Sequence, residues 1–125
     1  MTLRSTLEHV THPFVVRRRL PPPFSAARIF VTTEGGLRYL RPNMRRVDPV
    51  LLGLPEELVS PGDTVWDIGA NVSLFSFAAA VAAGRDGHVL AIERDVRLVS
   101  LLHRSARANH GHAPVEVLPA RSQTI

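Results

Sequence analysis

The chain has 125 residues, a length that predicts one domain able to bury its own core. It has no cysteine, which excludes disulfides and thiolate metal sites and fits a reducing compartment. The formal net charge is +4 and all fifteen basic residues are Arg, which we interpret as a compositional bias. We therefore do not expect nucleic acid as the main partner, although a basic surface permits such contact.

Membrane and export signals are not evident. No apolar run approaches the ~20 residues that a spanning helix needs, and the longest lies around 74–83. No continuous apolar segment follows Arg4, and the triple Arg at 17–19 is followed by three prolines. We therefore expect a cytoplasmic protein with no membrane partner.

Residues 1–23 and 24–60 predict two parts that precede the main domain. In the first, three Arg followed by three Pro predict a peripheral, extended and solvated connector. In the second, apolar stretches at 27–33 and 37–40 flank Gly35-Gly36, and this pattern predicts a β-hairpin.

A helical segment at 47–59 is expected to complete the second part. Asp48 before Pro49 is typical of a helix start. Gly53 and Pro55 are expected to limit the segment to short helical pieces, because both residues disfavour a helix interior.

Residues 61–125 predict an α/β unit. The expected elements, in chain order, are a strand at 64–68, a helix at 74–83 ending at Gly84, a strand at 88–93, a helix capped by Asp95 that runs to about 109, and a strand at 115–118. This alternation predicts a parallel sheet with right-handed crossovers and the spatial strand order 3-2-1. We expect the first strand to be buried and its Trp66 to belong to the core or to cover the sheet.

The turn after the first strand has the character of a binding turn. Gly69 lets the chain reverse and lets a ligand approach the backbone, and Asn71 tolerates the left-handed conformation. The helix that follows offers its N-terminal amides to a carboxylate or phosphate. Glu93, at the end of the second strand, is placed to accept hydrogen bonds from both hydroxyls of a ribose.

Asp67 distinguishes between two candidate ligands. A dinucleotide brings a negative pyrophosphate to this turn, and a carboxylate there would repel it. S-adenosylmethionine (SAM) instead brings an ammonium and a sulfonium, which a carboxylate attracts. The single Gly69 also falls short of the three glycines of the dinucleotide fingerprint.

The segment GDTVWDIGANVSLFSFAAA at 62–80, followed by VLAIERD at 89–95, closely resembles the FkbM-type family of SAM-dependent methyltransferases. DIGAN at 67–71 is the most specific part, and the segment IFVTTEGGLRYLRP at 29–42 is similar to that family's N-terminal extension. The resemblance implies an α/β fold that is the N-terminal half of a Rossmann-like methyltransferase, preceded by a β-hairpin. It also implies methyl transfer from SAM to a hydroxyl of a small-molecule acceptor.

In this family the residues that match Asp67, Gly69 and Asn71 would shape the pocket for the methionine part of SAM, and Glu93 would hold the ribose. The expected cofactor site therefore comprises Asp67, Gly69, Ala70, Asn71, Ser73 and Glu93. Ser73 departs from the family's usual Gly, although a serine can also cap the helix. Arg94 replaces the frequent Pro. No catalytic base and no adenine contact can be assigned.

Other interpretations remain open. The unit could be a fragment of an NAD-type enzyme, or the chain could be a non-catalytic basic binding module. Asp67 could simply cap a turn, and Glu93 could be a surface carboxylate paired with Arg94 or Arg97. We expect no metal site, because the histidine pairs at 9/12 and 110/112 lack a suitably placed third ligand.

The predicted sheet has an exposed edge. With three strands in the order 3-2-1, the strand at 64–68 would lie at the edge although it is central in a complete methyltransferase sheet. Unpaired apolar edges favour association. We therefore expect a fragment or a truncated gene product, and we regard self-association through this edge as an alternative.

Overall fold

The computed structural model describes residues 15–32 and 37–120. Its parallel sheet contains β3 (Thr64–Ile68), β4 (His88–Glu93) and β5 (Val115–Pro119), in the spatial order β3-β4-β5. Both strand pairs are parallel, which confirms the predicted order 3-2-1 and the predicted α/β class. The bounds of β3 and β4 are those that the sequence predicts, because alternating and β-branched patterns are local signals.

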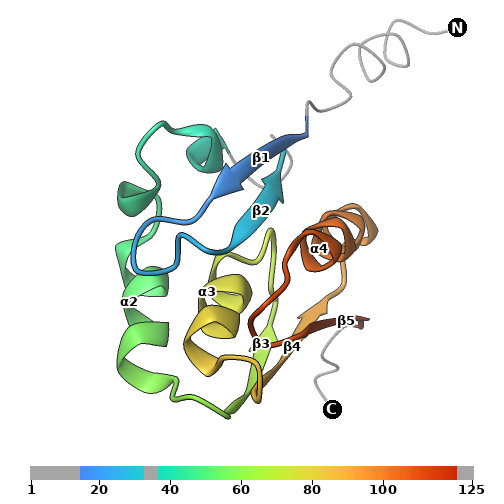
Figure 1. Cartoon of the computed structure of the whole chain (residues 1–125). Coiled ribbons are helices and arrows are strands. Elements are labelled where there is room, and N and C mark those ends of the chain that lie inside the picture. Colours follow the sequence, from blue (N-terminus) through green and yellow to red (C-terminus); the bar gives the residue numbers. More distant parts are fainter. Residues whose placement is uncertain (1–14, 33–36, 121–125) are drawn as a thin grey trace, which may run out of the picture.

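Two helices connect these strands and pack on one face of the sheet. The apolar helix α3 (Leu74–Ala83) follows β3, buries seven of its ten residues and ends at Gly84, whose φ of 68° suits glycine. The helix α4 (Val96–Ala108) follows β4 and buries Val99, Leu101, Leu102 and Ser105. Figure 1 shows α2, α3 and α4 from left to right across the molecule.

The hairpin differs from the predicted one. The strand β2 (Arg28–Val31) falls within the predicted segment 27–33, but its antiparallel partner is β1 (Val16–Arg19) and not residues 37–40. Residues 37–40 form a short 3-10 helix instead, and a second one follows at Met44–Arg46. The predicted Gly-Gly turn lies outside the described residues.

The prediction of a solvated connector is wrong at its C-terminal end, because the proline-rich segment is a packed loop. Leu20 and Phe24 are 1% and 3% exposed, and they anchor the loop that joins β1 to β2. The Leu20 N–H donates to the carbonyl of Ala27 at 3.0 Å, and this bond closes the loop at the point where β1 ends and β2 begins. The apolar anchors inside an Arg- and Pro-rich segment explain why composition alone misled the prediction.

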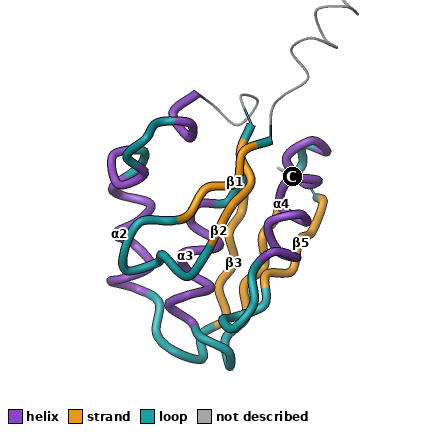
Figure 2. The backbone as a smooth tube through the Cα atoms, turned by 45° about the horizontal axis from the view of Figure 1, so that its top comes forward, coloured by secondary structure: helices purple, strands orange, loops and turns teal. Residues whose placement is uncertain are grey.

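The helix α2 (Pro49–Leu58) is continuous, although Gly53 and Pro55 predict short pieces. The side chain of Asp48 accepts a hydrogen bond from the Leu51 N–H at 3.0 Å, as predicted for its cap. Pro55 removes a single helical hydrogen bond, and α2 recovers this cost by packing along α3. Figure 2 shows α2 at one side of the molecule and α4 with β5 at the other, with α3, β1, β2 and β3 between them.

The other face of the sheet is open within the described part of the chain. Trp66 and Ile68 are 67% and 63% exposed, so the prediction that β3 is buried is wrong. Of the two places expected for Trp66, the core is excluded, and its side chain lies on the open face of the sheet. Both crossovers place their helices on the same face, and successive strand residues point to opposite faces. The side chains that point away from the helices therefore remain uncovered.

Candidate ligand-binding site

The carboxyl ends of β3 and β4 bring the predicted site residues together. Asp67 is the fourth residue of β3, Glu93 is the last residue of β4, and the turn between β3 and α3 lies across them. Asp67 is paired with Ala91, so Glu93 stands two residues further along on the same face of the sheet. All six predicted residues lie at this edge: Asp67, Gly69, Ala70, Asn71, Ser73 and Glu93.

The turn after β3 is held over β4 by its backbone. The N–H groups of Gly69 and Ala70 both donate to the carbonyl of Ile92, at 2.8 and 3.1 Å. Gly69 has φ 77° and Asn71 has φ 57°, which confirms the predicted left-handed conformation at Asn71. The two left-handed residues turn the chain sharply from the end of β3 toward α3.

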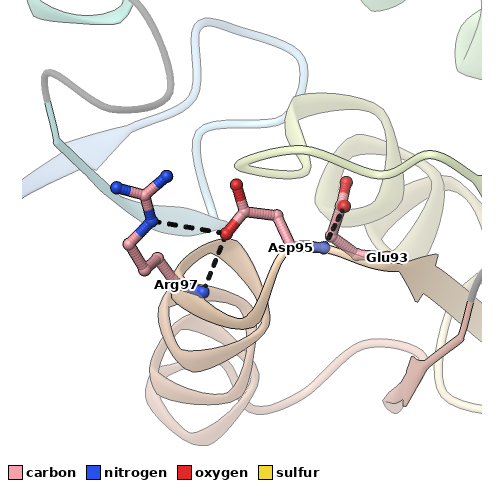
Figure 3. A network of polar contacts seen from close by, with 3 residues as sticks. All are labelled: Glu93, Asp95 and Arg97. Carbon is pink, nitrogen blue, oxygen red and sulfur yellow. Dashed lines mark hydrogen bonds and ion pairs between the residues drawn. The ribbon is translucent and has the colours of Figure 1, made fainter.

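Glu93 fastens this turn to the start of α4. Its Oε1 accepts from the Asn71 N–H at 2.9 Å, and its Oε2 accepts from the Asp95 N–H at 2.8 Å, as Figure 3 shows for Asp95. Arg97 pairs with Asp95 instead, at 3.6 Å. Glu93 is therefore a buried, backbone-bonded carboxylate, and the interpretation as a surface ion pair is wrong. Each of its oxygens has a second acceptor position that a ligand hydroxyl could use.

Asp67 is held by the first turns of α3. The Ser76 hydroxyl donates to Oδ2 of Asp67 at 2.6 Å. Burial raises the pKa of Asp67, hydrogen bonds from the hydroxyl and the backbone amide of Ser76 oppose this rise, and the charge of Glu93 adds to it. A partly desolvated carboxylate of this kind favours a cation as its ligand.

Ser73 is strained, and the predicted cap does not form. It stands before α3 with φ 75°, it is fully buried, and its hydroxyl has no hydrogen-bond partner. A glycine at this position would have neither the steric cost of a left-handed backbone nor an unpaired hydroxyl. Instead of a cap from Ser73, the first turn of α3 is held by the hydrogen bond that the Ser76 hydroxyl donates to Asp67.

Two backbone donors at the start of α3 are not paired with other described residues. Asn71 Oδ1 accepts from the Val72 N–H at 2.7 Å, and the Ser73 N–H donates to the carbonyl of Ala70 at 2.8 Å. The N–H groups of Leu74 and Phe75 have no hydrogen-bond partner among the described residues. The turn thus combines a fixed carboxylate with two helix amides, which suits a ligand that carries both a cation and an anion.

Two hollows of the described surface lie away from these residues. One is bounded by the loop Pro21–Phe24 and by Pro49, Leu52, Gly53 and Glu56 of α2, and it contains none of the six site residues. Within residues 15–32 and 37–120, no three His, Cys, Asp or Glu side chains form a group that could hold a metal ion. No helix in these ranges combines the length and apolar character that crossing a membrane requires.

The comparisons with known proteins define the fold. A search of family models and of curated proteins returned no match. Among solved structures, the chain is similar to a protein-L-isoaspartate O-methyltransferase, with a TM-score of 0.52 and 16% sequence identity. The similarity covers 92% of this chain and 31% of that structure. The chain therefore has the fold of part of a Rossmann-like, class I methyltransferase.

Sequence reasoning missed two residues of the site. Ser76 is not among the residues that the sequence assigns to the site, although its hydroxyl bonds Asp67. Asp95 was considered only as a helix cap, but its N–H also orients Glu93. The position of Ser76 offers a usable signal, because it lies in the first turn of a helix that follows a strand with an acid near its end. The first amides of a helix have no partner within the helix, so a nearby carboxylate can accept from them and from a hydroxyl there.

Proposed function

We propose that this chain is the SAM-binding part of a methyltransferase of the FkbM type, which methylates a hydroxyl of a small molecule. Asp67 would attract the ammonium of the methionine part, and Glu93 would accept hydrogen bonds from the ribose hydroxyls. The free amides of Leu74 and Phe75 would receive the methionine carboxylate. SAM itself supplies an activated methyl group for in-line displacement at sulfur, and positioning provides most of the catalysis.

One observation carries this proposal. A strand-end carboxylate and a second carboxylate lie on the same face of neighbouring parallel strands, beneath a turn with a single glycine. A pyrophosphate at this turn would meet Asp67, whose charge has no basic partner there, since its described neighbours contribute only the further negative charge of Glu93. The arrangement therefore favours SAM over NAD.

The FkbM type and the hydroxyl acceptor rest on the motif rather than on the fold. DIGAN at 67–71 with VLAIERD at 89–95 is the part of the chain that supports the family. Incubating the chain with SAM and hydroxylated small molecules, followed by mass spectrometry, tests this finer statement. A product heavier by one methyl group on oxygen supports it, and methylation on nitrogen or carbon contradicts it.

Calorimetric titration with SAM tests the cofactor. We expect binding to wild type, and a loss of about tenfold or more in affinity for Asp67→Asn, since a hydrogen bond to a charged group contributes about 1.5–3 kcal/mol. Glu93→Ala should weaken binding at least as much, because it also releases the turn at Asn71.

The matched control is Glu116→Ala, which removes an exposed carboxylate from β5 that is paired with His88. It should bind SAM like wild type. Each variant is first checked for a cooperative thermal transition. Binding of NAD in place of SAM, or equal SAM affinity in Asp67→Asn and wild type, would overturn the proposal.

A further inference from the structure

Ser76 makes a contact that a core residue of α3 does not need. The other residues of α3 are apolar, whereas Ser76 is fully buried and its hydroxyl lies 2.6 Å from Oδ2 of Asp67. Alanine would fill the same space in the helix without a polar group. The Ser76 hydroxyl therefore serves to hold the carboxylate of Asp67, which belongs to the candidate site.

Few charged groups face Asp67. α3 has no ionisable residue, and β3 has none apart from Asp67 itself. β4 contributes Glu93 on the same face of the sheet. Its His88 lies opposite Thr64 in the strand register, at the other end of β3 from Asp67. Burial and the charge of Glu93 both work against the ionised form of Asp67, and the hydrogen bonds from Ser76 are the interactions that favour it.

We propose that Ser76 is a positioning residue that keeps Asp67 ionised and aimed at a cationic ligand. The hydroxyl fixes Oδ2, and the remaining acceptor positions of the carboxylate stay available for an ammonium group. The inference deepens the proposed function, since it assigns the selectivity for a positively charged amino-acid group to the pair Ser76–Asp67. Ser76 itself does not contact the ligand.

The first experiment needs no ligand. NMR titration of the Asp67 side-chain carboxyl carbon is carried out on the free protein, on Ser76→Ala and on Ser105→Ala. Ser105 is the matched control because it is also a fully buried helix serine, but its hydroxyl accepts from the Phe30 N–H, away from the site. We expect the pKa of Asp67 to rise in Ser76→Ala alone. An unchanged pKa in Ser76→Ala would overturn the inference.

The second experiment measures SAM affinity against pH. A cationic ligand loses affinity as pH falls through the pKa of Asp67, so this loss should begin at a higher pH in Ser76→Ala than in wild type. Below both midpoints, where the ratio of the two affinities is largest, we expect the variant to bind about tenfold more weakly, while Ser105→Ala follows wild type. Ser76→Thr keeps the hydroxyl and should restore the wild-type pH profile.

These experiments separate the two proposals. If wild type does not bind SAM, the proposed function fails, but the carboxyl titration still decides whether Ser76 controls Asp67. If SAM binds and the pH profiles of wild type and Ser76→Ala coincide, the proposed function stands and the role of Ser76 is rejected. Should Ser76→Ala fail to fold, Ser76→Cys preserves the volume and replaces the hydroxyl with a weak donor.

Discussion

Ser73 shows at the scale of a single residue how the turn between β3 and α3 is constrained. Its φ of 75° is costly for a residue with a side chain, and its buried hydroxyl has no partner. The position follows Asn71, which is also left-handed, so two strained residues lie within three positions. Strain of this kind persists where the surrounding structure holds it, and here Glu93 and the carbonyl of Ile92 hold the turn.

Ser73→Gly should stabilise the protein by about 1 kcal/mol, because glycine accepts the left-handed backbone and removes the unpaired hydroxyl. Equilibrium unfolding in urea measures the change. The control is Ser100→Gly, an exposed position within α4, where the same substitution should destabilise the protein by about 0.5 kcal/mol. A Ser73→Gly variant no more stable than wild type would show that the serine is not strained.

At the scale of elements, side chains of α4 and of Asn109 hold the hairpin. They hydrogen-bond to backbone groups of β2 that a neighbouring strand would otherwise pair with. Asn109, which follows α4, accepts from the Arg28 N–H at 2.8 Å and donates to the Arg28 carbonyl at 2.6 Å. Two positions further along β2, the Phe30 N–H donates to the Ser105 hydroxyl at 2.8 Å. The guanidinium of Arg104 lies 4.4 Å from the centre of the Phe30 ring. Side chains of α4 thus satisfy the free edge of β2.

Asn109→Ala should destabilise the protein by about 1–3 kcal/mol, since it leaves both backbone groups of Arg28 unpaired in a half-buried place. Hydrogen exchange should accelerate at the amides of Arg28 and Phe30 more than at those of β4. The control His110→Ala changes an exposed neighbour and should leave exchange unaltered. Equal acceleration across β2 and β4 would mean that the contact does not act locally.

At the scale of the whole molecule, only one of the two faces of the parallel sheet is covered by other described elements. The helices and the hairpin cover one face of the parallel sheet, and the other face exposes apolar side chains beside the β3 edge. Uncovered apolar sheet faces and unpaired edges favour association. The side chains that point to this face are Thr64, Trp66, Ile68, His88, Leu90, Ile92, Glu116 and Leu118, of which His88 and Glu116 form an ion pair.

We therefore propose that the chain self-associates through this face and the β3 edge. Ile68→Lys should weaken the association by at least about tenfold in sedimentation velocity, because it places a charge among apolar side chains. Leu58→Lys is the control, since Leu58 is 69% exposed and lies at the end of α2. Trp66 is the only tryptophan, so its fluorescence should shift to shorter wavelength as concentration rises. A monomer at all concentrations would contradict the proposal.

The sequence by itself determined the parallel unit and most of the turn between β3 and α3. The bounds of β3, α3 and β4 follow from local hydrophobic patterns, and the left-handed Asn71 follows from the intrinsic tolerance of asparagine. The neighbourhood of Asp67 and Glu93 also follows, because acids that end adjacent parallel strands meet at one edge of a sheet.

Only the tertiary structure decided the remaining contacts. The partner of β2 is β1, across a loop whose buried Leu20 and Phe24 cannot be recognised within an Arg- and Pro-rich segment. The exposure of Trp66 depends on which face of the sheet the helices cover. The hydrogen bonds of Glu93 depend on where the turn and the start of α4 place the N–H groups of Asn71 and Asp95. Ser76 reaches Asp67 only because the turn folds α3 back over β3. Such contacts arise from packing between elements, and local patterns contain no information about them.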